Sequence, residues 1–259
     1  MRNLKPLHII LIFFASTLLI QCSKSYKLID YSSNNYNIDK NLSTNEFLEF
    51  DLKNYSKILE KEMNEVLNYS EKDMDIGCPE GLLGNFIADL TLISTIKEVD
   101  NTLYFCVLNN GGLRASLPKG KITRGKIYEI MPFDNEIVII DLTQEQIEEL
   151  FNYIKNRSLM KDTRKAGVPV SGLRMNINGT KISRIFIGIE EYNDQKKYKL
   201  ITTDYLANGG DNMDFLKNSK NIAHTGVLLR DAIINYVVIL NDQNIKISAE
   251  LDGRINHAE

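Results

Sequence analysis

The pair Asn178-Gly179 restricts the fold of this chain more than any other local feature. It separates two segments with many β-branched residues, 169–177 and 181–189. An Asn-Gly pair in this setting is the strongest short-range signal for a β-hairpin, because both residues tolerate the positive φ of a tight hairpin turn. An antiparallel hairpin here disfavours a doubly wound sheet built from parallel strands alone.

Strands and helices are expected to alternate along the rest of the chain. Short apolar runs predict strands at 103–108, 136–142 and 198–203. Residues Leu52, Tyr55, Leu59, Met63 and Val66 recur at steps of three and four, which predicts an amphipathic helix. Further helices are expected from 82, after the capping box that Thr143 and Gln146 form, and over 227–240. The pattern predicts a single α/β domain with a mixed sheet and helices.

The N-terminus has the pattern of an export signal. Arg2 and Lys5 precede an apolar run at 9–20 that is too short to span a bilayer comfortably, and Gln21 and Cys22 follow. We therefore expect a signal peptide over 1–21. Residues 18–22 resemble a bacterial lipoprotein processing site, which implies a lipid-anchored, exported protein of the bacterial cell envelope with Cys22 as the lipidated residue. A plain signal peptide with Cys22 as an incidental thiol, or an uncleaved anchor, are the alternatives.

The folded domain is expected to begin after a tether. Residues 22–45 are rich in Ser, Asn, Tyr and Lys and lack a sustained apolar period, so they are interpreted as a lipidated tether, and 46–259 as the domain. The net charge of −3 gives no indication of a nucleic-acid partner. Export would allow Cys78 and Cys106 to form a disulfide, whereas the apolar surroundings of Cys106 favour a buried free thiol. Both possibilities stay open.

Two expected strands end in glycine-rich turns with polar corners, Asn109 to Arg114 and Asn208 to Asp211. Glycine lets the backbone approach a ligand closely, Arg supplies donors and Asp accepts from hydroxyls. Either turn alone is more typical of an ordinary solvated turn. Phe133, on a turn stiffened by a proline, and Tyr205, beside the second turn, are candidates to sandwich a planar base. Taken alone, Phe133 is more typical of a core residue.

The order of these motifs is more specific than any one of them. It resembles the C-terminal domain of bacterial and animal 5′-nucleotidases over about residues 50 to 240. The motifs that carry the resemblance are EGLLGNFIAD at 80–89, NNGGLR at 109–114, GKIT at 120–123, MPFDN at 131–135, VSGLR at 170–174 and YLANGGD at 205–211.

The resemblance implies a substrate-binding role for five residues. In that family the C-terminal domain grips the nucleoside part of a nucleotide, while an N-terminal metallophosphoesterase domain with two metal ions performs the hydrolysis. Phe133 and Tyr205 would stack on the base, and Asp211 would accept hydrogen bonds from ribose hydroxyls. Asn109 would serve the base edge and Arg114 the ribose–phosphate side.

The chain also departs from the family pattern. Pro79 stands where the family often has a substrate-binding Arg, a loss for which Arg174 or Lys119 would have to compensate. Asn110 stands where the family usually has Gly, so the first turn is expected to be less open to a ligand. Glu80, Gly84, Asn85 and Asp89 are expected to serve helix start and packing.

The chain has only three histidines, His8, His224 and His257. A two-metal phosphoesterase site needs several His and carboxylate ligands around two ions, and neither His224 nor His257 has a ligand-spaced partner. We therefore expect no catalytic residue and no metal or cofactor site in this chain. Divalent metals are expected only in a partner metallophosphoesterase.

Three functional hypotheses follow. The first is a split 5′-nucleotidase, in which this lipoprotein recognises the nucleoside or nucleotide and a separate metallophosphoesterase chain supplies the metals for nucleotide catabolism. The second is a non-catalytic nucleoside-binding envelope lipoprotein. The third is a degenerate scaffold that binds no nucleoside, a reading suggested by Pro79 and Asn110.

Overall fold

The computed structural model describes residues 32–35, 46–96, 103–160 and 166–258. The expected signal peptide and Cys22 lie outside these ranges. The sheets and the site lie in one compact unit, which runs from Phe50 to Glu259. Within the described ranges no helix combines the length and the apolar character needed to cross a bilayer.

The fold is built on a mixed five-stranded sheet, which confirms the expected α/β class. Its strand order is β10-β4-β9-β2-β5. The central strands β2 and β9 run parallel, while the other neighbouring pairs are antiparallel. The strands are β2 (Leu103–Val107), β4 (Glu136–Asp141), β5 (Val170–Ser171), β9 (Tyr198–Thr203) and β10 (Ile222–Leu228).

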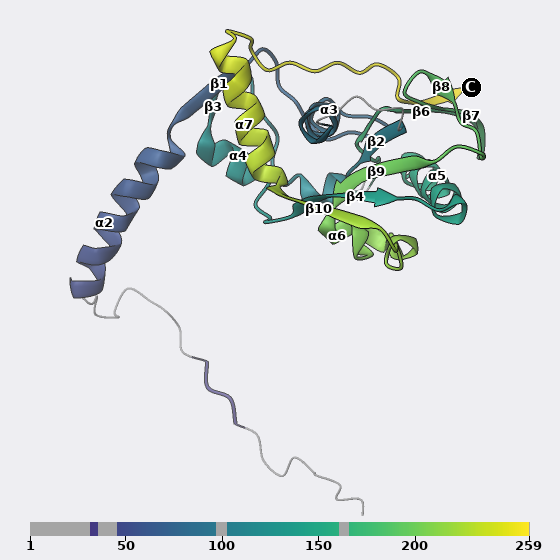
Figure 1. Ribbon diagram of the computed structural model, residues 1–259. Helices are drawn as coiled ribbons and strands as arrows, with labels where there is room; N and C mark the ends of the chain where they lie inside the picture. Colours follow the sequence, from purple (N-terminus) through teal and green to yellow (C-terminus); the bar gives the residue numbers. More distant parts are fainter. Residues whose placement is uncertain (1–31, 36–45, 97–102, 161–165, 259) are drawn as a thin grey trace, which may run out of the picture. The chain divides into compact units, whose positions relative to one another are not determined.

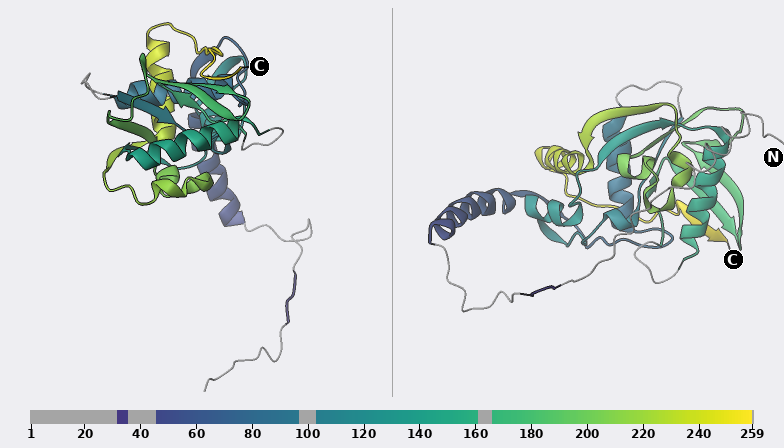
Figure 2. Two further views of the ribbon diagram at one scale, coloured as in Figure 1. Left: turned by 90° about the vertical axis from the view of Figure 1, so that its right-hand side faces the viewer. Right: turned by 90° about the horizontal axis from the view of Figure 1, so that it is seen from below.

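A second, four-stranded sheet contains the predicted hairpin. Asn178 pairs with Lys181, so the two loop residues are 179–180, and Gly179 has the positive φ of 59° that such a turn needs. The hairpin is confirmed, with its loop one residue later than the Asn-Gly pair. The C-terminal strand, yellow in Figure 2, pairs in parallel with the first hairpin strand. The sheet has the order β11 (Ile255–Ala258), β6 (Leu173–Asn178), β7 (Lys181–Ile187) and β8 (Glu190–Glu191).

A two-stranded sheet and the helices complete the described structure. The capping box at Thr143 and Gln146 is present in full, with each side chain bonded to the other residue's backbone N–H. The strands are β1 (Val66–Ser70) and β3 (Gly120–Thr123), and the helices are α2 (Glu46–Met63), α3 (Leu82–Thr95), α4 (Arg124–Ile130), α5 (Gln144–Ser158), α6 (Asp204–Ala207) and α7 (Leu229–Asp242). Short 3₁₀ turns lie at η1 (Asn110–Gly112), η2 (Gly210–Asn212) and η3 (Asp214–Leu216).

Successive residues of the central strands enter two different cores, because side chains of a strand point alternately to its two faces. Cys106 and Ile201 join the core under α3 and α7. Phe105 and Leu200 join the opposite core, which includes α5, α6 and the hairpin. Figure 1 shows α3 and α7 on one side of the sheet and α5 and α6 on the other.

Three expected element boundaries were wrong. Val66 does not continue the first helix but begins β1, where it pairs with Thr123. The segment expected as one strand at 169–177 is divided at Gly172, whose φ of +70° ends β5 before β6 begins. Val227 belongs to the unpredicted strand β10 and the helix begins at Leu229, because an apolar run does not distinguish strand from helix by periodicity alone.

The two cysteines of the described domain are not linked. Cys106 is fully buried and Cys78 contacts the carbonyls of Ser158 and Met160, and both thiols are free. Burial raises the pKa of each thiol, so both stay protonated at neutral pH. Of the two alternatives drawn from the sequence, the structure has the free thiols.

The acidic residues of the first helix motif hold the C-terminal segment. Asp89 on α3 accepts two hydrogen bonds of 2.7 Å from Arg254 and one of 2.6 Å from Ser171. Glu80 accepts from the backbone N–H groups of residues 252 and 253. These contacts agree with the structural role expected for this motif.

Candidate functional site

The two glycine-rich turns lie side by side because the strands that precede them are parallel neighbours. β2 and β9 pair in register from Leu103 with Tyr198 to Cys106 with Ile201, so their carboxyl ends reach the same edge of the sheet. This edge is where ligands commonly bind in α/β sheets. The amide of Asn109, after β2, donates to Oδ2 of Asp211, after β9, at 2.5 Å.

The turns and the loop between α4 and β4 line one cavity of about 320 Å³. All five residues that the sequence analysis assigned to substrate binding contribute to it. The lining consists of Asn109, Gly111, Gly112, Arg114, Phe133, Asn135, Tyr205 and Asp211. Of these, Asn135 belongs to a motif quoted above but had received no role, and the two glycines were expected only to let the backbone approach a ligand.

The two aromatic rings are held at the surface instead of being buried in a core. Phe133 is 41% exposed and Tyr205 is 45% exposed. Asp204, at the start of α6, links the two segments that carry the rings. Its Oδ1 accepts from the backbone N–H of Glu136, which begins β4 after the Phe133 loop, at 3.1 Å and from that of Tyr205 at 2.7 Å. The expectation that Phe133 taken alone is a core residue was therefore wrong.

Asp211 is fixed by contacts on its backbone. It has a left-handed conformation, with φ 51° and ψ 30°, which Asp tolerates better than most residues. Its carbonyl accepts from the Tyr153 hydroxyl at 3.1 Å and from Nη2 of Arg157 at 2.7 Å. Burial raises the pKa of Tyr153 to about 12, so this hydroxyl stays protonated and remains a donor at neutral pH.

Neither Tyr153 nor Arg157 carried a sequence signal. They lie four residues apart on α5, the spacing of side chains on one helix face, and α5 is far in sequence from the turn that they support.

The carboxylate of Asp211 is only partly occupied by its protein partners. Oδ2 accepts from Asn109 and Oδ1 accepts from the Tyr205 hydroxyl over a long 3.4 Å. An ionised carboxylate offers about four acceptor sites, so further donors can bind here. Arg114 is exposed, and its guanidinium donates a long hydrogen bond of 3.4 Å to the carbonyl of Gly111. The cavity is thus lined by two aromatic side chains, an anionic acceptor and a cationic donor.

The departures from the family pattern have different consequences in the structure. Asn110 is buried and donates to the carbonyls of Gly77 and Ala166, so its side chain is not among those that line the cavity. Arg174 is bound to Asp252 through two hydrogen bonds. Neither Arg174 nor Lys119 lines the cavity. Neither therefore replaces the Arg side chain that the family often has at the position of Pro79.

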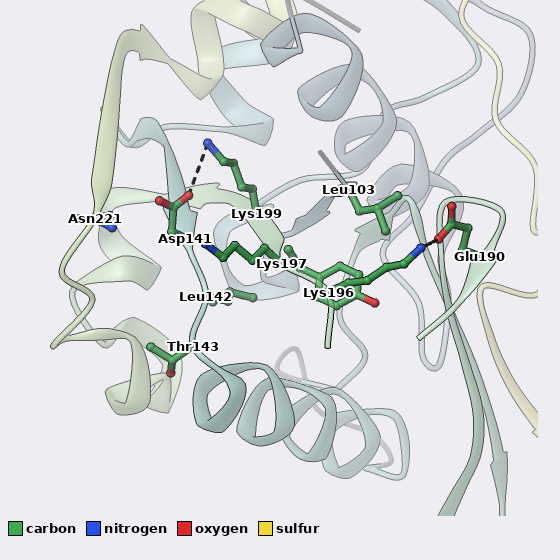
Figure 3. Close-up of a pocket in the computed structure, with 10 residues that line it drawn as sticks. Leu103, Asp141, Leu142, Thr143, Glu190, Lys196, Lys197, Lys199 and Asn221 are labelled. Atoms are coloured by element: carbon green, nitrogen blue, oxygen red, sulfur yellow. Dashed lines mark hydrogen bonds and ion pairs between the residues drawn. The ribbon is translucent and has the colours of Figure 1, made fainter. Parts of the chain in front are cut away.

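A larger cavity, of about 630 Å³, lies elsewhere, at the amino ends of β2 and β9. Figure 3 shows three lysines around it, of which Lys196 forms an ion pair with Glu190 and Lys199 one with Asp141. None of the five predicted site residues lines this cavity. Size alone does not identify a site, and convergent polar groups on an aromatic lining favour the smaller cavity.

The described residues do not form a dimetal site. His224 lies on β10, where its Nδ1 is 2.8 Å from Oε2 of Glu136, and this hydrogen bond lowers the pKa of Glu136. His257 lies on β11, 3.2 Å from the hydroxyl of Ser158. In the parts of the chain that the structure describes, no three His, Cys, Asp or Glu side chains are grouped to hold a metal ion. We therefore derive no metal-dependent step from these residues.

Gly210 provides a test of the local packing. A Cβ at this position would lie 2.5 Å from Cζ and 2.6 Å from Cδ1 of Tyr205. Gly210→Ala should therefore push the ring aside and destabilise the fold by about 1–3 kcal/mol, the usual range for overpacking. The measurement is thermal or denaturant unfolding in a double-mutant cycle. In a Tyr205→Ala background the same substitution should have little effect, and an equal loss in both backgrounds would contradict this account.

Comparisons with known proteins identify the family and the fold of this chain. Residues 64–218 match the family described as 5′-nucleotidase, C-terminal domain. The chain is 27% identical over 233 residues to the Trifunctional nucleotide phosphoesterase protein YfkN of Bacillus subtilis, covering 84% of this chain and 16% of that protein. It is 24% identical over 146 residues to the 5′-nucleotidase of Vibrio parahaemolyticus, covering 56% of this chain and 26% of that one. The chain thus spans about a quarter or less of these relatives.

Solved structures show the same fold. The 5′-nucleotidase precursor of Thermus thermophilus superposes with a TM-score of 0.67 at 27% identity, over 82% of this chain and 43% of that one. The NAD nucleotidase of Haemophilus influenzae superposes with a TM-score of 0.63 at 16% identity, over 83% and 42% of the two chains, which supports the fold alone. The resemblance found in the sequence is confirmed, and the chain belongs to the 5′-nucleotidase C-terminal domain family.

Proposed function

We propose that this chain is the nucleoside- and nucleotide-recognition half of a split 5′-nucleotidase, and that a separate metallophosphoesterase chain supplies the metals and the hydrolysis. The observation that carries the proposal is the convergence of Phe133, Tyr205, Asp211 and Arg114 on one cavity at the carboxyl ends of parallel strands. Each of these four side chains can make the type of contact that one part of a nucleotide needs.

The proposed binding mode assigns the base to the two rings. Stacking on an aromatic side chain contributes about 1–3 kcal/mol per base in nucleic-acid complexes and accepts any base. The free acceptor sites of Asp211 would receive the vicinal hydroxyls of the ribose. Asn109 stands beside that carboxylate, near the base edge, and Arg114 would serve the ribose–phosphate side, since its guanidinium binds anions at fixed geometry.

An exposed face of α2 supports a separate protein partner. Its apolar side chains Leu52, Tyr55 and Leu59 are each more than half exposed. Their spacing of three and four places them on one helix face. An exposed apolar face of this kind marks a surface for a partner.

The charges on α2 favour a protein partner over a membrane. Lys53, Lys57 and Lys61 recur every four residues, so they lie on the helix face opposite the apolar one. A helix that docks on anionic lipid needs its basic residues beside the buried face. Asp51 and Glu62 flank the apolar side chains instead, so the partner surface is expected to be an apolar groove with a basic rim.

Nucleoside binding is tested by isothermal titration of the purified domain with adenosine. Phe133→Ala and Tyr205→Ala should each weaken the affinity by roughly 5- to 150-fold, the equivalent of about 1–3 kcal/mol. The matched control is Tyr69→Ala, because Tyr69 on β1 is 44% exposed, nearly as much as Tyr205, and does not line the cavity. The proposal would be contradicted if the wild-type protein bound no nucleoside, or if the site variants bound it as tightly as the control does.

The split arrangement is tested by reconstitution with metallophosphoesterase chains of the same organism. AMP hydrolysis should appear only when this chain, the partner and a divalent metal are combined. Leu52→Glu and Tyr55→Glu should abolish co-purification and reduce the joint activity at least tenfold, while Lys57→Glu on the opposite helix face should leave both unchanged.

Two outcomes of the reconstitution would contradict the split arrangement. Hydrolysis by this chain alone after removal of metal would overturn it. Tight adenosine binding with no phosphoesterase partner in any fraction would favour the non-catalytic envelope receptor instead.

We also propose that Cys22 carries a lipid and anchors the protein in the bacterial cell envelope. The support is the sequence of residues 1–22, which lie outside the described structure. Cys22→Ser should move the protein from the membrane fraction to the soluble or secreted fraction and abolish labelling with a radioactive fatty acid. Cys78→Ser is the control, because it removes a thiol but not the proposed lipid site. Retention of the label by Cys22→Ser would exclude this attachment.

A further inference from the structure

One buried side chain, that of Arg230, binds the backbone of the loop that carries Phe133. Arg230 lies in the first turn of α7, and its Nη1 donates to the carbonyls of Met131 and Phe133, both at 3.4 Å. Its Nη2 forms an ion pair with Asp134. One guanidinium therefore binds three of the four residues from 131 to 134.

Arg230 is also packed in place. Its Cζ lies 4.3 Å from the centroid of the Tyr128 ring, within the range of a cation–π contact. Only 10% of its side chain is exposed. Its Nε is buried and has no hydrogen-bond partner among the described residues. A buried guanidinium with an unsatisfied Nε donor is a poor source of stability compared with an apolar side chain, so stability alone does not explain an arginine here.

We propose that Arg230 is a positioning residue for Phe133, which sets nucleoside affinity by fixing the loop without touching the ligand. This inference rests on the proposed function. Phe133 is almost half exposed, so few side-chain contacts restrain its ring, and its place depends on the loop backbone. Arg230 restrains that backbone at the Phe133 carbonyl itself, and the N–H of Leu229 adds a bond of 2.9 Å to the Asn135 carbonyl. When the Phe133 ring is already held in position, less conformational entropy is lost on ligand binding.

The test compares Arg230→Met with wild type in adenosine titrations. Methionine keeps much of the apolar volume but none of the donors, so the affinity should fall by roughly three- to tenfold, which corresponds to ordering one or two groups on binding. The matched control is Arg184→Met. Arg184 also combines an ion pair, with Glu191, and a ring contact, with Phe186, but it lies on the hairpin, so its loss should leave the affinity unchanged.

A thermodynamic cycle separates positioning from general destabilisation. If Arg230 acts through the ring, Arg230→Met should have no further effect on adenosine affinity in a Phe133→Ala background. Arg230→Lys can keep the ion pair with Asp134 but not both carbonyl bonds, and should give an intermediate affinity. Asp134→Asn leaves the guanidinium in place, removes the negative charge of its exposed partner and should weaken binding in the same direction, which keeps the test usable if Arg230→Met fails to fold.

A readout without ligand completes the test. In the unliganded protein the NMR signals of the Phe133 ring should broaden or shift in Arg230→Met and not in Arg184→Met. Unchanged ring signals, or an equal loss of affinity in the Phe133→Ala background, would overturn the inference. Loss of binding in Phe133→Ala together with full affinity in Arg230→Met would overturn this inference alone. Wild-type protein that binds no adenosine would instead overturn the proposed function.

Discussion

The parallel pairing of β2 with β9 is the contact on which the candidate site depends. Neighbouring parallel strands end at the same edge of a sheet, so the glycine-rich turn after β2 meets there with the one that follows β9 and the short helix α6. The pair lies inside the sheet, with β4 on one side and β5 on the other. Alternate side chains of both strands are buried in two different cores, so a shift of register by one residue would place each set of side chains in the core that is packed for the other.

The ligand-facing groups are held mainly by contacts on their backbones. Asp204 connects the start of β4, next to the Phe133 loop, with α6, which carries Tyr205. Tyr153 and Arg157 fix the carbonyl of Asp211. Such contacts leave the rings, most of the carboxylate and the Arg114 guanidinium available to a ligand. An arrangement of this kind is organised before the ligand arrives, which lowers the entropic penalty of binding. The short hydrogen bond from the Asn109 amide to the Asp211 carboxylate links the two glycine-rich turns directly.

The local parts of this fold were predictable because the physical causes are local. The hairpin follows from the φ that Gly179 allows, and the start of α5 follows from the capping box of Thr143 and Gln146. Strand β10 was missed since its apolar residues continue into those of α7, and Gly172 divided an expected strand in two. Both errors arise where backbone conformation is decided by pairing with distant strands.

The sequence by itself determined the α/β class, the positions of most elements, the family and the five candidate site residues, because these depend on short-range patterns and ordered motifs. Only the tertiary structure decided that these five residues share one cavity, that Asn110 is turned into the protein, and that Arg230 holds the Phe133 loop from a helix 97 residues away in the chain. Contacts over such separations depend on how strands and helices pack, and a packed arrangement leaves no period or spacing in the sequence.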